Sequence, residues 1–129
     1  MKRASFEHNV ELEQRIDPQV LLRRAIMIIR ARRKRIELFG ASMFREPAWD
    51  MLLALFVASE GRRLTIGRLT AVVGAPMTTA LRWIQYLIDQ GLVIRELHPT
   101  DARAVFVELS ESGKSLIELY LYETLMIAP

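Results

Sequence analysis

The residues in this chain best placed to do chemistry are an acid and an arginine two positions apart, Asp101 and Arg103. They lie in the stretch HPTDARAVFVELSESGK, residues 98–114, where a turn-rich loop leads into a segment that alternates like a β-strand. A carboxylate in a tight turn can hold a nearby guanidinium by a charge-assisted hydrogen bond. The pair could therefore present an oriented cation to a ligand, or it could be an ordinary surface ion pair worth under about 1 kcal/mol.

Other residue types that support catalysis are scarce. The chain has no cysteine, which excludes disulfides, cysteine zinc sites, a cysteine nucleophile and thiol-based redox sensing, and which fits a reducing compartment. Its only histidines are His8 and His98; no glycine-rich phosphate loop follows a strand, and no carboxylate pair recurs at a metal-ligand spacing. We therefore predict that the protein is not an enzyme and needs no metal or cofactor, and we interpret His98 as a turn residue.

Composition and charge indicate a single globular domain with a basic N-terminal region. The 129 residues are 51% hydrophobic and 26% charged. Residues 1–40 hold ten Lys or Arg against five acids, whereas residues 92–129 hold three against six. The basic run RARRKR, Arg30–Arg35, suits a polyanion or an acidic membrane surface, although a solvated helix face explains it equally well. No secretory signal and no uncharged apolar run of about 18 residues is present, so we expect a cytoplasmic protein without a membrane span.

The elements that must position these residues follow from apolar periodicity and from capping residues. We expect a flexible tail over 1–16 and a helix over 17–40 capped by Asp17. The first half of this helix is apolar nearly all round and so requires partners on two sides. The remaining expected elements are a helix from Pro47, a short extended piece at 62–64, a helix over 66–73 capped by Thr65, a helix over 77–90, strands at 92–95 and 104–109, and a helix over 111–129 capped by Ser110.

The helix over 77–90 is the one with an informative exposed face. Its predicted inward residues are Met77, Leu81, Ile84 and Leu87 or Ile88. At 100° per residue, the opposite face carries Thr79, Arg82 and Tyr86, flanked by Thr78, Trp83 and Asp89. The helices 66–73 and 77–90 are joined by Gly74-Ala75-Pro76, which is a helix-turn-helix pattern, and the two strands add a wing. The fold class we predict is mainly α with a small β-hairpin, a winged helix-turn-helix over 47–110.

With this order of elements, residues 47–114 resemble the DNA-binding core of the MarR family of bacterial transcription regulators. The likeness rests on PAWDMLLAL, on LTIGRLTAVVGAPMTTALRWIQYLIDQGLV and on the wing RELHPTDARAVFVELSESG. The wing, with its Asp-x-Arg and the glycine that follows, is the specific part. The matching positions are Thr79, Arg82, Leu87, Gly91, Leu92, Arg95, Pro99, Asp101, Arg103, Ala104, Val107, Leu109 and Gly113.

The resemblance implies a transcription regulator that binds double-stranded DNA, with the recognition helix 77–90 in the major groove and the wing 95–109 at the minor groove. Arg103 would enter the narrow minor groove, where negative potential is enhanced, and Asp101 would orient it without touching DNA. In the recognition helix, Thr78, Thr79 and Arg82 could contact phosphates or base edges. The candidates for phosphate contacts are Arg62, Arg63 and Arg68, each of which could equally be a solvated arginine.

The resemblance also implies a homodimer and a small-molecule effector. Family members typically have a C-terminal helical pair, whereas this sequence has one helix before Pro129, so a dimer is expected to use the first and last helices. The family commonly senses phenolic or lipophilic molecules, and Met43, Phe44, Trp49 and Met51 could line such a site, although a core role for them is favoured. The alternative function is a winged-helix module that binds protein and not DNA. One continuous positive face around Arg82, Arg103 and Arg30–Arg35 would favour DNA over that alternative.

Overall fold

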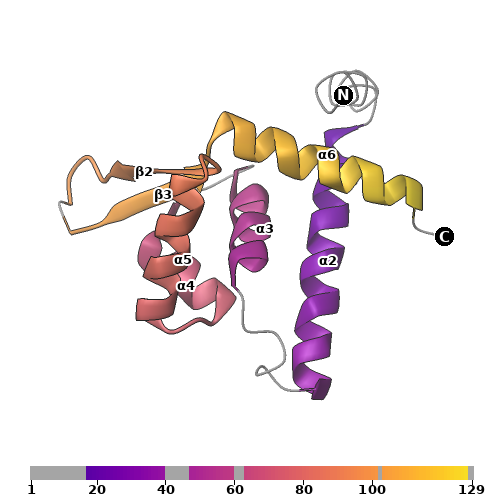
Figure 1. Cartoon of the computed structure of the whole chain (residues 1–129), viewed down its shortest axis with the longest axis horizontal. Coiled ribbons are helices and arrows are strands. Elements are labelled where there is room, and N and C mark those ends of the chain that lie inside the picture. The colour runs from indigo at the N-terminus through magenta and orange to yellow at the C-terminus, as the bar shows by residue number, and fades with distance from the viewer. Residues whose placement is uncertain (1–16, 40–46, 60–62, 102, 128–129) are drawn as a thin grey trace.

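Three helices and three strands form the winged helix, and two further helices flank it. The computed structural model describes residues 17–39, 47–59, 63–101 and 103–127, so the predicted tail over 1–16 lies outside the described residues. The elements are α2 (Pro18–Phe39), α3 (Ala48–Ala58), β1 (Leu64–Thr65), α4 (Ile66–Val73), α5 (Met77–Asp89), β2 (Val93–Leu97), β3 (Val105–Leu109) and α6 (Glu111–Ile127). Figure 1 shows α3 between α5 and α2, with α6 running across the top from the wing to α2.

The helices α2, α4 and α6 each begin at a residue whose side chain caps the first turn. Asp17 Oδ1 accepts the backbone N–H of Gln19 at 3.0 Å, and Ser110 Oγ accepts that of Gly113 at 3.0 Å. Thr65 Oγ1 accepts the N–H of Arg68 at 3.1 Å, at the start of α4. These bonds satisfy donors that the first turn of a helix leaves without intrahelical partners. The three predicted caps are therefore confirmed.

The sheet has three antiparallel strands in the order β1-β3-β2. The predicted hairpin is present as β2 and β3, with Arg95 opposite Val107. The short piece before α4 adds the third strand, because Leu64 pairs with Val107 on the other edge of β3. Val107 is fully buried at the centre of the sheet. The sheet therefore ties the wing to the start of the helix-turn-helix.

The hydrophobic core consists of two clusters that share α3. One cluster lies under the helix-turn-helix and the sheet, and the other lies where α2, α3 and α6 meet. From α3, Met51 and Leu55 belong to the first cluster and Leu53 and Phe56 to the second. The first cluster also contains Ala54, Leu69, Ala80, Ile84, Leu87, Val93 and Val107, and the second Leu21, Ala25, Ile117, Leu121 and Tyr122.

The predicted inward face of α5 is wrong at two positions. Met77 and Leu81 are 48% and 45% exposed, whereas Ala80, Ile84 and Leu87 form the buried side. The small side chain of Ala80 is fully buried, and Leu81, one residue further along, lies about 100° round the helix from it. The helix is thus rotated relative to the prediction, and two aliphatic side chains that were expected in the core lie at the surface.

Candidate nucleic-acid interface

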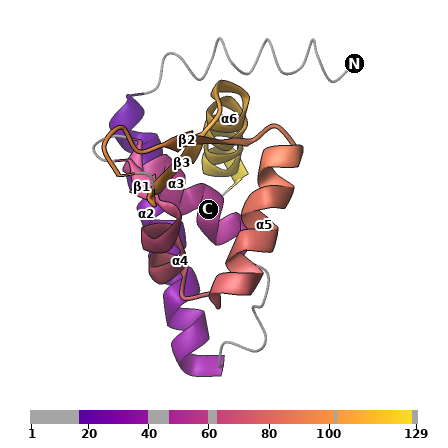
Figure 2. The same ribbon diagram turned by 90° about the vertical axis from the view of Figure 1, so that its left-hand side faces the viewer.

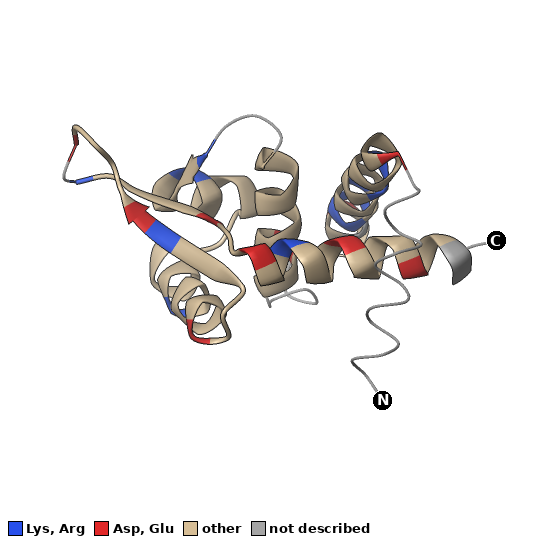
Figure 3. Ribbon diagram, turned by 90° about the horizontal axis from the view of Figure 1, so that it is seen from above, with Lys and Arg blue, Asp and Glu red and all other residues tan. Residues whose placement is uncertain are grey.

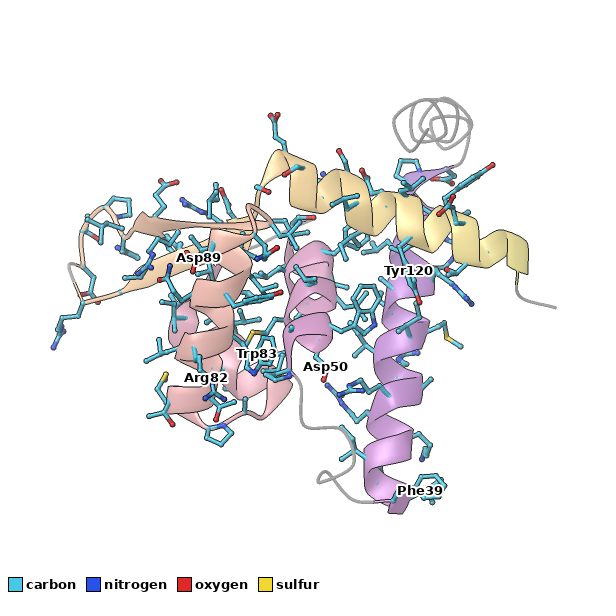
Figure 4. All side chains as sticks on the ribbon, in the orientation of Figure 1. Phe39, Asp50, Arg82, Trp83, Asp89 and Tyr120 are labelled. Carbon is cyan, nitrogen blue, oxygen red and sulfur yellow. The ribbon has the colours of Figure 1, made fainter. Side chains whose placement is uncertain are left out.

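The outer side of α5 is the first part of the candidate interface. In Figure 2, α5 lies at the edge of the molecule, and no other described helix or strand covers its outer side. Arg82 is exposed there, as predicted, and so is Thr78, which was predicted at the flank of this face. Thr79 was predicted on the outer face itself but is half-buried, in keeping with the rotation of the helix. Figure 4 shows Arg82 on the N-terminal half of α5 and Asp89 at the end nearest the strands. The positive charge of α5 therefore lies in its N-terminal half, and a negative charge lies at its C-terminal end.

The second part is the tip of the wing, which projects away from both core clusters (Figure 1). The side chain of Arg103 is 94% exposed, and its Nε lies 3.5 Å from Asp101 Oδ1. The same Asp101 oxygen accepts the backbone N–H of Arg103 at 3.0 Å. One carboxylate thus contacts both the backbone and the guanidinium of the arginine. The predicted pairing of Asp101 with Arg103 has the geometry of an orienting contact that leaves the guanidinium accessible.

Arg63, beside the wing, is engaged within the protein. Its Nη2 lies 2.8 Å from a carboxylate oxygen of Glu96 on β2, and its Nε lies 3.4 Å from one of Glu108 on β3. Its guanidinium also lies 4.5 Å from the ring centroid of Phe106, a cation–π distance. Two acids and an aromatic ring therefore surround a residue that was predicted as a phosphate contact. This arrangement supports a role for Arg63 in bracing the wing strands.

Sequence reasoning missed a polar network that links α5 to β2. Arg95 Nη2 donates to Gln85 Oε1, and Gln85 Nε2 donates to Asp89 Oδ1 at 2.9 Å. All three residues are exposed to solvent. The network places a second arginine beside α5. The one signal in the sequence that singled out Arg95 was its match to the family's wing pattern. Alternation alone marks this residue only as a solvent-facing strand position.

The remaining basic residues are divided between two parts of the molecule. Arg68 on α4 is exposed, and Arg62 lies outside the described residues. The basic run Arg30–Arg35 lies on α2, on the far side of α3 from α5 and the wing (Figure 3). Within this run, Arg32 Nε donates to Asp50 Oδ2 at 2.6 Å. The positive face that would have joined the two regions is therefore interrupted by α3 in a single chain.

Comparison with solved structures gives this arrangement a precedent. Escherichia coli MarR, in a mutant form, superposes with a TM-score of 0.56 and 22% identity over 86% of this chain and 78% of that one. The Staphylococcus aureus MepR–DNA complex superposes with a TM-score of 0.55 and 19% identity over 73% of this chain and 65% of MepR. A MepR mutant from a clinical isolate gives 0.53 and 21% identity over 62% of each chain.

This chain has the winged-helix fold of the MarR family. The predicted fold class is thereby confirmed: the structure is mainly helical with a small antiparallel sheet. No protein-family model and no curated protein matches the sequence. The superposed region covers 62% of the MepR mutant and 65% of MepR in its DNA complex, which is less than two thirds of either chain.

The MarR-like fold leaves a cavity of about 390 Å³ between α2, α3 and α4. Small-molecule sites are commonly of this size and mostly apolar. The Arg32–Asp50 pair lies at this cavity, and Figure 4 shows Asp50 pointing from α3 toward α2. Neither Trp49 nor Met51 lines the cavity. Its walls are Ile29, Arg32, Arg33, Ile36, Asp50, Ala54, Val57, Ala58, Leu64, Val72, Val73 and Gly74.

Each of the two tryptophans packs against a tyrosine ring. Trp83 is half-buried, packs against the core cluster under the helix-turn-helix and meets Tyr86 edge to face at 5.5 Å. Trp49 meets Tyr120 of α6 in the same way at 4.8 Å. Met51 is fully buried, so the predicted core role is confirmed for it. Met43 and Phe44 lie outside the described residues.

The described residues offer neither a metal site nor a membrane span. Among residues 17–39, 47–59, 63–101 and 103–127, no group of three or more His, Asp or Glu side chains is placed to hold a metal ion. Within the same ranges, every helix is too short or too polar to cross a bilayer. The solved structures that share this fold, MarR and MepR among them, are transcription regulators.

Proposed function

We propose that this protein is a transcription regulator that binds double-stranded DNA, with α5 in the major groove and the wing at the adjacent minor groove. The observation that carries the proposal is the wing tip, where Arg103 is almost fully exposed and Asp101 holds it from one side. An arginine presented in this way suits a narrow groove with negative potential. The shared fold of a solved MepR–DNA complex supports the same reading.

Each exposed polar residue then has a stated part. Arg82 and Thr78 would contact base edges or phosphates from α5, and Arg68 would contact a phosphate. Arg95, held by Gln85, is a further cation at the groove edge. Thr79 is a weaker candidate than Thr78, because it is half-buried. Sparse base contacts by α5 mean that the wing and the DNA shape would supply much of the affinity.

A homodimer through α2 and α6 is part of the proposal. Leu116 and Tyr120 on α6 and Met27 on α2 are exposed apolar residues next to the second core cluster. At the crossing of these helices, Arg24 Nη2 donates to the Thr124 carbonyl at 3.5 Å, while Arg24 Nε is buried without a hydrogen-bond partner among the described residues. A second copy would cover the apolar side chains, and two wings would then read half-sites about one helical turn apart. Light scattering that gives a monomer at micromolar concentration would remove this part of the proposal.

The cavity between α2, α3 and α4 is the place where an effector would act. Its walls are largely aliphatic, and Arg32 and Arg33 lie at it. Such a lining would accept a small apolar molecule that carries an acidic group. Because the cavity touches Gly74 in the turn of the helix-turn-helix, a bound molecule could bias the position of α5. Calorimetric titration with a lipophilic carboxylate, in wild type and Arg33→Ala, tests this assignment.

The experiment that tests DNA binding is fluorescence anisotropy on random duplex DNA across a salt series. The apparent affinity should fall linearly on a log–log plot, with a slope of about −0.9 per phosphate contact. Arg103→Ala should weaken binding and make the slope less negative by about 0.9, the contribution of one phosphate contact. The matched control is Lys34→Ala, which removes an exposed charge from α2, on the other side of α3, and should leave the slope unchanged.

A protein-binding module is the second candidate, and the surface of α5 favours it. Met77 and Leu81 are exposed on this helix together with Tyr86, and Asp89 adds an acid near its end. The basic run of α2 is also separated from α5 by α3. If wild type does not bind duplex DNA at about 50 mM salt, where phosphate contacts are strong, the exposed side of α5 becomes the surface on which to search for a protein partner.

A further inference from the structure

The wing turn is organised around the ring of His98. The imidazole Nδ1 accepts the backbone N–H of Thr100 at 3.1 Å and that of Asp101 at 3.1 Å. The hydroxyl of Thr100 lies 3.4 Å from the same nitrogen. The backbone N–H of His98 donates to the carbonyl of Ala104 at 3.1 Å, which closes the turn. One ring nitrogen thus satisfies two backbone donors that lead directly to the Asp101–Arg103 pair.

These bonds fix the protonation state of the ring. Two N–H groups point at Nδ1, so Nδ1 must be an unprotonated acceptor and the hydrogen must be on Nε2. In the imidazolium form both ring nitrogens are donors. A proton on Nδ1 would therefore face the N–H groups of Thr100 and Asp101, and the two bonds would be lost. Histidine is the side chain that ordinarily changes its charge between pH 5 and 8.

The groups around the ring define what else a new proton would meet. The ring of Phe106 on β3 lies against His98, with centroids 5.0 Å apart and an angle of 30°. The guanidinium of Arg63 contacts the same phenyl ring and is paired with Glu96 and Glu108. The wing tip itself holds the carboxylate of Asp101, which is already engaged by the Arg103 N–H and guanidinium.

We propose that His98 is a positioning residue for the wing: its neutral ring shapes the turn that presents Arg103, and a proton on the ring opens that turn and weakens DNA binding. The inference rests on the proposed function for its consequence, but not for its structural part. It is distinguishable from a simple charge effect by sign. Added positive charge near DNA strengthens binding by attracting phosphates, whereas loss of the wing turn weakens it.

The structural part is tested on the free protein by following backbone amide resonances from about pH 8 to about pH 5, the range in which histidine titrates. The amides of Thr100 and Asp101 should shift together with the His98 ring, and their protection against solvent exchange, relative to the intrinsic exchange rate at each pH, should fall at the acidic end. In His98→Asn the side-chain oxygen can accept the same two N–H groups as an Asx turn, so those amides should stay constant. Amides in wild type that do not follow the ring would overturn the proposal.

The functional part is tested by anisotropy with duplex DNA at the two ends of that range. Wild type should bind roughly thirtyfold more weakly at the acidic end, the effect expected when two hydrogen bonds of ordinary strength are lost. His98→Asn should bind with the same affinity at both ends, and His98→Ala should bind weakly at both. The matched control is His8→Asn, which removes the other histidine and should keep the wild-type pH response.

The outcomes separate the two proposals. If wild type binds no DNA at either end of the range, the proposed function fails, while the amide titration still decides whether His98 shapes the turn. If wild type binds DNA with equal or greater affinity at the acidic end, the role of His98 is refuted and DNA binding stands. A His98→Asn variant that keeps the full pH response would refute it as well.

Discussion

The contact between Gly113 and Leu92 provides the sharpest test of how the wing is joined to the rest of the molecule. Gly113 is buried in the first turn of α6, against the backbone just before β2. A Cβ added there would overlap the carbonyl oxygen of Leu92 and lie 3.0 Å from its carbonyl carbon and 3.2 Å from its Cα. These are backbone atoms, so no side-chain rotation relieves the overlap. Gly113→Ala must therefore move α6 away from the start of β2.

The size of the effect follows from what that movement breaks. Ser110 N donates to the Leu92 carbonyl at 2.9 Å, Ser110 Oγ to the Gly91 carbonyl at 2.6 Å, and Ser112 Oγ to the same carbonyl at 3.0 Å. Each bond contributes about 1 kcal/mol. Overpacking adds a further cost of about 1–3 kcal/mol. The higher helix propensity of alanine offsets about 1 kcal/mol of this loss. We expect the free energy of unfolding to fall by about 3–5 kcal/mol and the thermal unfolding midpoint to fall by about 10–20 °C.

Urea unfolding monitored by circular dichroism measures this loss, and Gly67→Ala is the matched control. Gly67 is exposed in the first turn of α4, and an added Cβ would meet no atom within 4 Å. That substitution should leave stability unchanged or raise it by up to about 1 kcal/mol. If Gly113→Ala unfolds within about 0.5 kcal/mol of wild type, the close approach of α6 to β2 is not a constraint on this fold, and the reasoning is wrong.

Two further predictions concern helix attachment. Thr65→Ala removes the acceptor of the Arg68 N–H and should cost about 1 kcal/mol, whereas Thr65→Ser should be close to neutral, as thermal unfolding would show; equal losses in both would exclude the cap as the cause. The Arg32–Asp50 pair is only 15% and 21% exposed, so a double-mutant cycle with Arg32→Ala and Asp50→Ala should give a coupling energy of about 1–2 kcal/mol in urea unfolding. A coupling near zero would mean that α2 and α3 are joined by apolar packing alone.

Local signals predicted the elements well because capping and turn chemistry are local. The caps at Asp17, Thr65 and Ser110 were each predicted from a residue and its immediate neighbours, and each is present. The Asp101–Arg103 pairing was also predicted, since both residues lie in one turn. These features need only a few residues of chain, so tertiary context has little opportunity to override them.

The features that sequence reasoning missed depend on how elements meet. The rotation of α5 is set by the buried Ala80, whose small size lets the helix approach its neighbours, and periodicity ranked the larger Met77 and Leu81 above it. The pairing of Leu64 with Val107 joins segments more than 40 residues apart, which no local pattern encodes. The engagement of Arg63 by two strands is likewise a product of sheet topology.

The two clusters of the core bear on where regulation can act. Met51 and Leu53 stand two residues apart on α3, yet each is fully buried in a different cluster, one under the helix-turn-helix and one against α2 and α6. Leu109, at the end of β3, packs against both clusters. A displacement of α2 that moved α3 would therefore reach the helix-turn-helix directly, because packed interiors transmit small shifts. The wing tip, by contrast, lies beyond both clusters and is shaped by its own hydrogen bonds. A ligand in the cavity beside α2 and a proton on His98 would thus act on different halves of the proposed DNA-binding surface.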